Sequence, residues 1–231
     1  MKIMTFNTQH CESYITNKID FEAMAKVITD FDADFVGLNE MRGEGPLPNF
    51  TAQTEKLSEL TKMPYYYFGE AIKVGGTSPY GNGFLSKIPI LKTEKIMIPD
   101  PEVRDNTLYE TRCILKITLE GGITVLVTHF GLNLTEKENA VKTVLESLEN
   151  EKCILMGDFN VRPEDELLMP IKAKMKDTAE VFEKELLSHP SDKPDKKIDY
   201  IFVTPDILVK AADIPAVIAS DHRPHTAEID I

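Results

Sequence analysis

The sequence contains no tryptophan, only three cysteines, and no apolar run approaching the roughly 20 residues that a membrane-spanning helix needs. The cysteines, Cys11, Cys113 and Cys153, are odd in number and scattered, so they do not indicate a disulfide framework. Such usage is typical of a reducing cytoplasm. The apolar stretch in residues 1–6 is too short for a signal peptide, and no small-residue cleavage site follows it. We therefore expect a cytoplasmic protein without a membrane span.

Basic charge is also scarce. The chain has 26 Lys and Arg residues against 38 Asp and Glu residues, which gives a formal net charge of −12. The densest basic cluster, Lys193, Lys196 and Lys197, is interleaved with Asp192 and Asp195, and no basic stripe is visible. Few Lys and Arg contacts to phosphates mean few released counterions and weak affinity for a long polyanion. Strong binding of duplex DNA is therefore not expected.

The order of apolar patterns predicts one domain over residues 1–231, because no stretch resembles a linker or a repeat. Apolar residues at helical spacing predict helices over 18–31, 51–62 and 178–187, and another that opens near Thr135. Strand-like segments are predicted at 2–6, 34–39, 65–73, 83–86, 90–98, 107–119, 123–129, 152–156, 198–203, 216–219 and 225–229. This pattern alone supports an α/β or α+β fold.

Polar residues that could bind a metal or transfer a proton stand at one end of an apolar strand-like segment in six places. They are Asn7, Asn39-Glu40, His129, Asp158, Asp199 and Asp221-His222. Strand ends at one edge of a sheet lie side by side, so we expect these residues to converge. The four acids among them would repel one another without a cation. Carboxylate and amide oxygens suit Mg²⁺ or Mn²⁺ better than zinc.

Two of the motifs are specific: Gly157-Asp158-Phe159-Asn160 and Ser220-Asp221-His222-Arg223-Pro224. Together with Asn7, Asn39-Glu40, Thr128-His129-Phe130, Ile198-Asp199-Tyr200 and the segment 81–90, they run in order from residue 3 to residue 224. In these motifs the chain resembles the endonuclease/exonuclease/phosphatase superfamily, which includes deoxyribonuclease I, AP endonucleases, sphingomyelinases, inositol polyphosphate phosphatases and deadenylases. Many members have Gln where this chain has Asn39.

The resemblance implies a four-layer sandwich, in which two mixed, largely antiparallel β-sheets pack face to face with helices on both outer sides. It also implies a divalent-metal-dependent phosphoric ester hydrolase, in which water attacks phosphorus in line. Glu40 is then the principal metal ligand, with Asn7 and Asp221 completing the metal shell directly or through water. Asn82 and Arg112 are candidates for binding the substrate phosphate. Arg112 has an equal alternative, an ion pair with Glu110 on an exposed face.

The resemblance makes His222 the general base that takes a proton from the attacking water, with Asp199 orienting its ring. A division of roles found in some relatives makes Asp158 the base instead, and the sequence does not choose between them. Asn160 is expected on the same side of an extended segment as Asp158, facing the phosphate. His129 is expected to donate a hydrogen bond to the transition state or a proton to the leaving oxygen.

Acidity and the lack of tryptophan favour a small soluble phosphoester, such as a sugar or inositol phosphate, over nucleic acid. The alternative is an endonuclease or exonuclease acting on DNA or RNA. A non-catalytic binding protein on the same fold is less favoured, because every expected site position is filled. We expect a monomer, with His10 and His225 outside the catalytic set.

Overall fold

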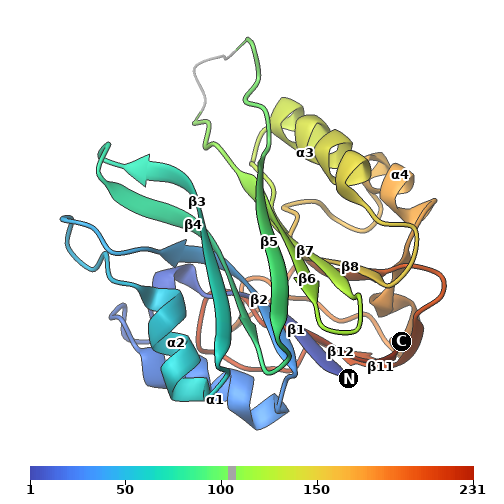
Figure 1. The fold of residues 1–231 in the computed structure, drawn as a ribbon, viewed down its shortest axis with the longest axis horizontal. Coiled ribbons are helices and arrows are strands. Elements are labelled where there is room, and N and C mark those ends of the chain that lie inside the picture. The colour runs from blue at the N-terminus through green and yellow to red at the C-terminus, as the bar shows by residue number, and fades with distance from the viewer. Residues whose placement is uncertain (104–107) are drawn as a thin grey trace.

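Two six-stranded sheets pack face to face in the computed structural model, which describes residues 1–103 and 108–231 (Figure 1). Helices α1 (Phe21–Phe31) and α2 (Gln53–Thr61) cover the outer side of one sheet. Helices α3 (Leu134–Ser147) and α4 (Met169–Lys172) cover the outer side of the other. The predicted four-layer α/β sandwich is therefore confirmed.

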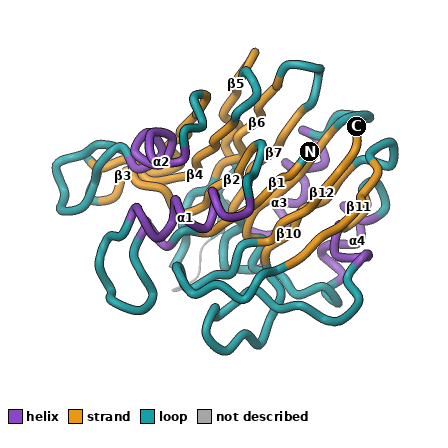
Figure 2. The backbone as a smooth tube through the Cα atoms, turned by 90° about the horizontal axis from the view of Figure 1, so that it is seen from below, coloured by secondary structure: helices purple, strands orange, loops and turns teal. Residues whose placement is uncertain are grey.

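The first sheet has the strand order β11-β12-β1-β2-β4-β3, seen from below in Figure 2. Its strands are β1 (Lys2–Asn7), β2 (Phe35–Arg42), β3 (Tyr65–Val74), β4 (Ser78–Ser86), β11 (Leu208–Asp213) and β12 (His225–Asp230). Only the central pair β1 and β2 is parallel, and its register sets Asn7 opposite Asn39. Since both strands run the same way, their carboxyl ends reach the same edge of the sheet.

The second sheet has the strand order β5-β6-β7-β8-β10-β9. Its strands are β5 (Ile90–Met97), β6 (Cys113–Leu119), β7 (Thr124–His129), β8 (Cys153–Asp158), β9 (Lys176–Asp177) and β10 (Asp199–Val203). Again one central pair is parallel, β7 with β8, and its register sets His129 opposite Asp158. Each sheet thus sends the carboxyl ends of two neighbouring parallel strands to one end of the molecule.

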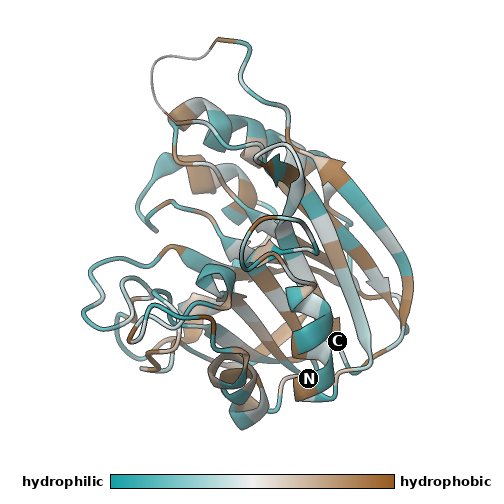
Figure 3. Ribbon diagram, turned by 90° about the vertical axis from the view of Figure 1, so that its left-hand side faces the viewer, coloured by the Kyte–Doolittle hydropathy of each residue, from teal (hydrophilic) through white to brown (hydrophobic). Residues whose placement is uncertain are grey.

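The buried apolar side chains form three clusters, one for each interface between layers. Phe35 and Met156 belong to the cluster between the two sheets. Phe159 belongs to the cluster under α3 and α4, while Leu38 of β2 and Met24 of α1 belong to the cluster between the first sheet and its helices. Each fully buried large apolar side chain contributes roughly 1.5–3 kcal/mol to folding. In Figure 3 the outer helices show both hydrophilic and hydrophobic segments, as expected for helices with one face in solvent.

The predicted elements differ from the structure in the second half of the chain. Residues 216–219 form no strand, since they lie in the loop between β11 and β12. Strand β11 was missed because it is an edge strand whose residues are mostly exposed, so it lacks a buried apolar run. The helix predicted over 178–187 is only the short 3-10 turn Thr178–Val181, which buries Thr178 alone. Strand β6 begins at Cys113, and Thr107, its predicted start, lies outside the described residues.

The two ends of the chain lie close together, with the Met1 amino group donating to the Ile229 carbonyl at 2.6 Å (Figure 1). Within residues 1–103 and 108–231, no helix combines the length and the apolar composition needed to cross a membrane.

Gly81 in β4 offers a test of how tightly the first sheet is built. It lies opposite a bulge in β3, where a Cβ would overlap the Gly69 carbonyl oxygen and lie 2.8 Å from the Ala71 nitrogen. Backbone atoms cannot move aside as a flexible side chain can, so Gly81→Ala should lower the free energy of unfolding by about 3 kcal/mol, at the upper end of overpacking penalties. Urea denaturation measures this loss.

The matched control is Gly76→Ala in the turn between the same two strands. A Cβ there meets no heavy atom within 4 Å, although the backbone φ of +73° disfavours alanine. The expected loss is about 1–2 kcal/mol, the penalty for a left-handed alanine. Equal losses for the two variants would show that the contact at Gly81 does not constrain the sheet.

Candidate active site

The amide side chain of Asn39 joins the two sheets where the parallel strands end. Its Nδ2 donates to Asn82 Oδ1 and to the Thr128 carbonyl, both at 2.9 Å, and its Oδ1 accepts from the backbone N–H of Asp158 at 2.9 Å. Asn39 is fully buried. The sequence placed Asn39 among the polar residues at strand ends and showed it as a departure from the family pattern, but assigned it no role of its own. Its position beside Glu40 at the end of a buried strand was the available signal for a structural role.

Asn7 connects the carboxylates of Glu40 and Asp158. Its Nδ2 lies 3.1 Å from both Glu40 Oε1 and Asp158 Oδ2. Glu40 has a left-handed backbone (φ 62°), and the pairing of β2 with β4 shifts register between Leu38 and Met41. Such a bulge re-aims a side chain. It explains how Glu40, inside a strand rather than at its end, reaches the rim of the sheets.

His222 lies between two carboxylates. Its Nδ1 is 2.8 Å from Asp199 Oδ2, and its Nε2 is 3.6 Å from Asp158 Oδ2. Burial lowers the pKa of His222, but the carboxylates of Asp199, Asp158 and Asp221 outweigh it and raise the pKa to about 10. Burial raises the pKa of Asp158, although the charge of His222 opposes the shift. In the protein without a bound cation, His222 therefore carries a proton at neutral pH.

His129 and Asn160 complete the surroundings of Asp158. His129 Nε2 is 3.4 Å from Asp158 Oδ2 and 3.2 Å from Asn160 Nδ2. Burial, followed by the Arg112 guanidinium, lowers the pKa of His129 well below its usual value, so the ring is neutral. Its Nδ1 is buried with no hydrogen-bond partner among the described residues.

The backbone conformation that places Asn160 beside Asp158 differs from the predicted one. Strand β8 ends at Asp158, and Asn160 is left-handed (φ 50°) rather than extended. Its backbone N–H donates to Asp158 Oδ1 at 2.9 Å, and its Nδ2 donates to the Phe130 carbonyl at 3.1 Å. The predicted closeness of Asn160 and Asp158 is therefore produced by a tight turn, not by strand alternation.

Asp221 lies on the side of His222 that faces His189. The ring centroids of His189 and His222 are 4.6 Å apart, and His189 Nε2 is 3.8 Å from Asp221 Oδ2. No hydrogen bond or ion pair joins Asp221 to Glu40 or Asn7 among the described residues. Asp221 therefore groups with the two histidines, while Glu40 groups with Asn7. His189 was not singled out from the sequence, because it stands in a polar loop without a strand pattern.

The two predicted phosphate-binding residues are both engaged within the protein. Asn82 accepts from Asn39 and donates to the Cys113 carbonyl at 3.0 Å, which leaves one N–H of its amide for another partner. Arg112 Nη1 lies 2.9 Å from Glu110 Oε1, so the alternative ion pair forms. However, only 11% of the Arg112 side chain is exposed, so this pair does not stand on an exposed face.

The charges of the site favour a hard divalent cation. Four carboxylates gather here, and none forms an ion pair with Lys or Arg within the described parts of the chain. Their charged or chargeable partners are histidines. The carboxylates of Glu40 and Asp158 share only the neutral Asn7 amide. A protonated His222 offsets only part of the negative charge of these four carboxylates, and such oxygen donors fit Mg²⁺ or Mn²⁺. A buried group formed by Asp158, Asp199 and His222 also has ligand atoms close enough for a metal.

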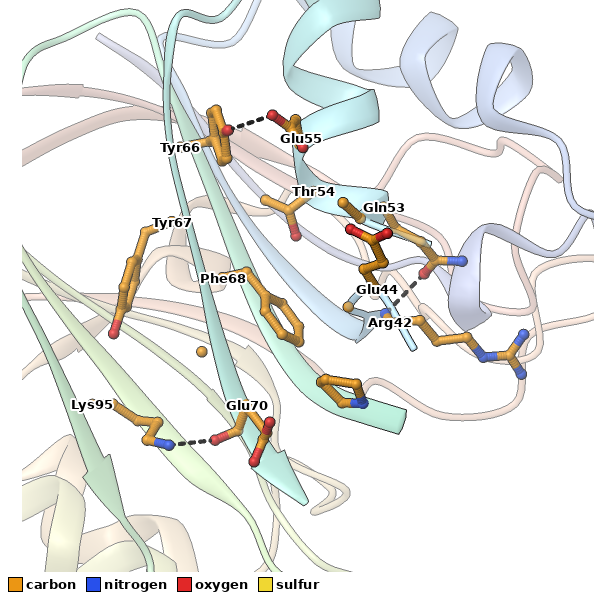
Figure 4. A pocket seen from close by; sticks show the side chains of 14 residues that line it. Arg42, Glu44, Gln53, Thr54, Glu55, Tyr66, Tyr67, Phe68, Glu70 and Lys95 are labelled. Carbon is orange, nitrogen blue, oxygen red and sulfur yellow. Dashed lines mark hydrogen bonds between the residues drawn. The ribbon is translucent and has the colours of Figure 1, made fainter. Parts of the chain in front are cut away.

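A separate cavity of about 460 Å³ lies between β3 and the start of α2 (Figure 4). Its polar groups are largely bound to one another, with the Tyr66 hydroxyl donating to Glu55 at 2.9 Å and Lys95 donating to the Glu70 carbonyl at 2.8 Å. None of the predicted site residues lines it. This cavity is therefore distinct from the group of predicted site residues.

The comparisons with known proteins agree with this architecture. The family model described as "Endonuclease/Exonuclease/phosphatase family" matches residues 4–222. A structure titled endonuclease/exonuclease/phosphatase from Beutenbergia cavernae is 22% identical, with a TM-score of 0.81 over 99% of this chain and 71% of that one.

Two further structures carry functional names. The mannosyl-6-phosphatase of Bacteroides thetaiotaomicron is 16% identical, with a TM-score of 0.77 and full coverage of both chains. The human Nocturnin catalytic domain with bound sulfate is 14% identical, with a TM-score of 0.70 over 100% of this chain and 94% of that one. At these identities the likeness establishes the fold. No curated protein matches the sequence.

His225 provides a pH test that does not depend on a cation. It is fully buried, with Nε2 3.0 Å from Thr178 Oγ1 and Nδ1 3.2 Å from the Asp199 carbonyl. Burial lowers its pKa to about 4 from the ordinary 6.5. Because the unfolded chain takes up this proton first, the stabilisation is complete above pH 6.5 and is lost as the pH falls toward 4.

The expected loss from this one group is on the order of 3 kcal/mol. Urea denaturation of the wild type and of His225→Phe between pH 7 and pH 4 measures it. The wild type should lose stability more steeply than the variant, which has no proton to gain at this position. Parallel profiles would show that His225 is not held neutral by the fold.

Proposed function

Because this chain belongs to the endonuclease/exonuclease/phosphatase family, whose members generally hydrolyse phosphoester bonds, we propose that it is a phosphoric ester hydrolase that uses Mg²⁺ or Mn²⁺. The observation that carries the proposal is the meeting of Glu40, Asn7, Asp158 and His222 at one rim between the sheets. There the Asn7 amide bridges the carboxylates of Glu40 and Asp158. These lie beside His222, whose ring Asp199 orients.

Glu40 is the residue that we propose to hold the cation, with Asp158 adjacent. Asn7 turns its Nδ2 to both carboxylates, and its Oδ1 accepts from the Gln9 backbone N–H at 3.1 Å, so we propose that it positions the ligands or reaches the cation through water. A divalent cation bound there would polarise a phosphoryl oxygen and offset the negative charge of the carboxylates. The contribution of the protein is to present these oxygen ligands already gathered, because Asn7 holds Glu40 and Asp158 at 3.1 Å from one amide nitrogen. We propose that Asp221 supports the His222 side of the site rather than contacting the cation directly.

His222 is the proposed general base. Asp199 accepts a hydrogen bond from Nδ1 at 2.8 Å, which fixes the ring and leaves Nε2 to face the site. Nε2 must be unprotonated to accept a proton from water. The uncompensated carboxylates oppose this, since they raise the pKa of His222 to about 10. Activity at neutral pH therefore requires that part of this negative charge be offset, which links base function to cation binding.

Asp158 contributes differently under this proposal. Its Oδ2 lies 3.6 Å from His222 Nε2 and 3.1 Å from Asn7 Nδ2, so it can hold the attacking water in place for His222. The alternative assignment of Asp158 as the base relies on the same geometry. The Asp199–His222 contact favours His222, because an orienting carboxylate is the usual companion of a histidine base.

His129 and Asn160 supply neutral hydrogen-bond donors. A buried neutral His129 can donate to a phosphoryl oxygen, but it holds no extra proton to give to a leaving group. Asn160 lies 3.2 Å from His129 and is fixed by its bonds to Asp158 and Phe130. Of the two roles expected for His129, we therefore propose stabilisation of the transition state rather than proton donation.

A small soluble phosphoester, such as a sugar or inositol phosphate, is the proposed substrate. The net charge of −12 disfavours a long polyanion. Arg112, whose guanidinium helps to lower the pKa of His129, is already paired with Glu110, so it offers little free positive charge to a nucleic-acid backbone. The phosphatase and the sulfate-bound structure among the fold neighbours are compatible with small anions in this fold.

Hydrolysis should require Mg²⁺ or Mn²⁺ and should vanish in EDTA. A panel of phosphomonoesters, phosphodiesters and plasmid DNA, assayed with each cation and with chelator, tests both cation and substrate. Small esters should be cleaved faster than plasmid. Full activity after exhaustive chelation would contradict the metal assignment, and faster cleavage of plasmid, with tight salt-sensitive duplex binding, would make the nuclease the better assignment.

His222→Ala should lower kcat by about two to four orders of magnitude, the usual range for loss of a general base. Asp199→Asn should lower it less, because the ring is misoriented rather than removed. Circular dichroism and Mn²⁺ binding should show that the fold and the cation site survive in both variants. A severe loss in Asp158→Asn beside a mild loss in His222→Ala would reverse the proposed roles.

A further inference from the structure

His10 stands in an unusual piece of backbone beside the proposed cation site. Gln9, His10 and Cys11 are consecutive residues with φ of 48°, 58° and 58°, which makes a short left-handed turn directly after β1. Each left-handed residue other than glycine costs roughly 1–2 kcal/mol. Strained backbone persists only where its surroundings hold it, and it concentrates at functional sites.

The contacts of His10 fix its ring from several directions. The backbone carbonyl accepts from Gln53 Nε2 at 2.7 Å, which anchors the turn to the start of α2. The ring packs edge-on against Tyr80 with centroids 5.4 Å apart. Its Nδ1 lies 3.2 Å from the Glu40 carbonyl oxygen and 3.5 Å from Glu40 Oε2. One ring nitrogen therefore faces both the backbone and the carboxylate of the same residue.

Glu40 needs such support. Its own backbone is left-handed at a bulge, and Asn7 restrains only one of its oxygens, Oε1. A glutamate side chain has three rotatable bonds, so holding one oxygen leaves the other free to turn away. His10 Nδ1 stands beside that second oxygen. Asn7, the last residue of β1, and His10, in the turn that follows, thus approach the two oxygens of the Glu40 carboxylate.

We infer that His10 is a positioning residue that fixes the Glu40 carboxylate for the divalent cation. Residues that hydrogen-bond a metal ligand from outside the metal shell orient it, and their loss weakens metal affinity by about 10–100-fold. The inference rests on the proposed function, because Glu40 must hold a cation for the positioning to matter. The sequence analysis placed His10 outside the catalytic set, and it remains outside that set, since it acts through Glu40.

The test measures Mn²⁺ affinity by isothermal titration calorimetry, without substrate. His10→Ala should weaken Mn²⁺ binding by about 10–100-fold. His10→Asn places an amide nitrogen where Nδ1 stands and should bind Mn²⁺ nearly as well as the wild type. His10→Gln places its nitrogen one bond further out, near the position of Nε2, and should behave like His10→Ala. Melting temperatures without metal report separately on the fold, since asparagine suits a left-handed position better than the other replacements.

The inference is overturned if His10→Ala and His10→Gln bind Mn²⁺ as the wild type does, or if His10→Asn is as weak as His10→Ala. Glu40→Gln distinguishes this failure from that of the proposed function. Weak binding in Glu40→Gln beside unchanged binding in His10→Ala removes only the role of His10. A wild-type protein that binds no Mn²⁺ removes both.

Discussion

The three hydrogen bonds of the Asn39 amide determine where the other groups of the site stand. They tie β2 of the first sheet to β7 and β8 of the second, so the end of each parallel pair is fixed against the other. Asp158 receives its position from the same amide that holds the Thr128 carbonyl beside His129. An apolar side chain at Asn39 would leave a buried N–H and a buried carbonyl unpaired. Each such group costs about 1–3 kcal/mol.

Neutral amides hold this acidic site together without cancelling its charge. The Asn7 side chain bridges Glu40 and Asp158, and the backbone N–H of Asn160 donates to the other oxygen of Asp158. A lysine or arginine in place of Asn7 would instead form an ion pair and neutralise part of this charge. The amides satisfy the hydrogen bonds of the carboxylates while leaving their charge available. The high pKa of His222 is the visible consequence of that remaining charge.

The apolar patterns predicted most of the strands and an α/β or α+β fold, and the polar residues at the strand ends were expected to converge. The four layers came from the family resemblance that the ordered motifs carry. The local backbone geometry could not be predicted from the sequence. Glu40 reaches the rim through a bulge, and Asn160 reaches Asp158 through a left-handed turn, neither of which has a periodic signature. His222 stands in a loop rather than at a strand end. His189 was not singled out, and the contact of His10 with Glu40 was not predicted, because contacts between distant segments have no local sequence signature.

The long sequence separation between the residues of the site has a consequence for biosynthesis. Strands β1 and β2 are made early, yet Asn7 bonds to Asp158, 151 residues later, and His222 follows only after β10 and β11. A nascent chain that has not yet reached His222 lacks both the complete acidic cluster and the imidazole whose pKa that cluster raises. Contacts of such sequence separation form late, because a long loop must close before they stabilise anything. Emergence of residue 222 from the ribosome therefore sets the earliest moment at which the growing chain can assemble this cluster of carboxylates and histidines.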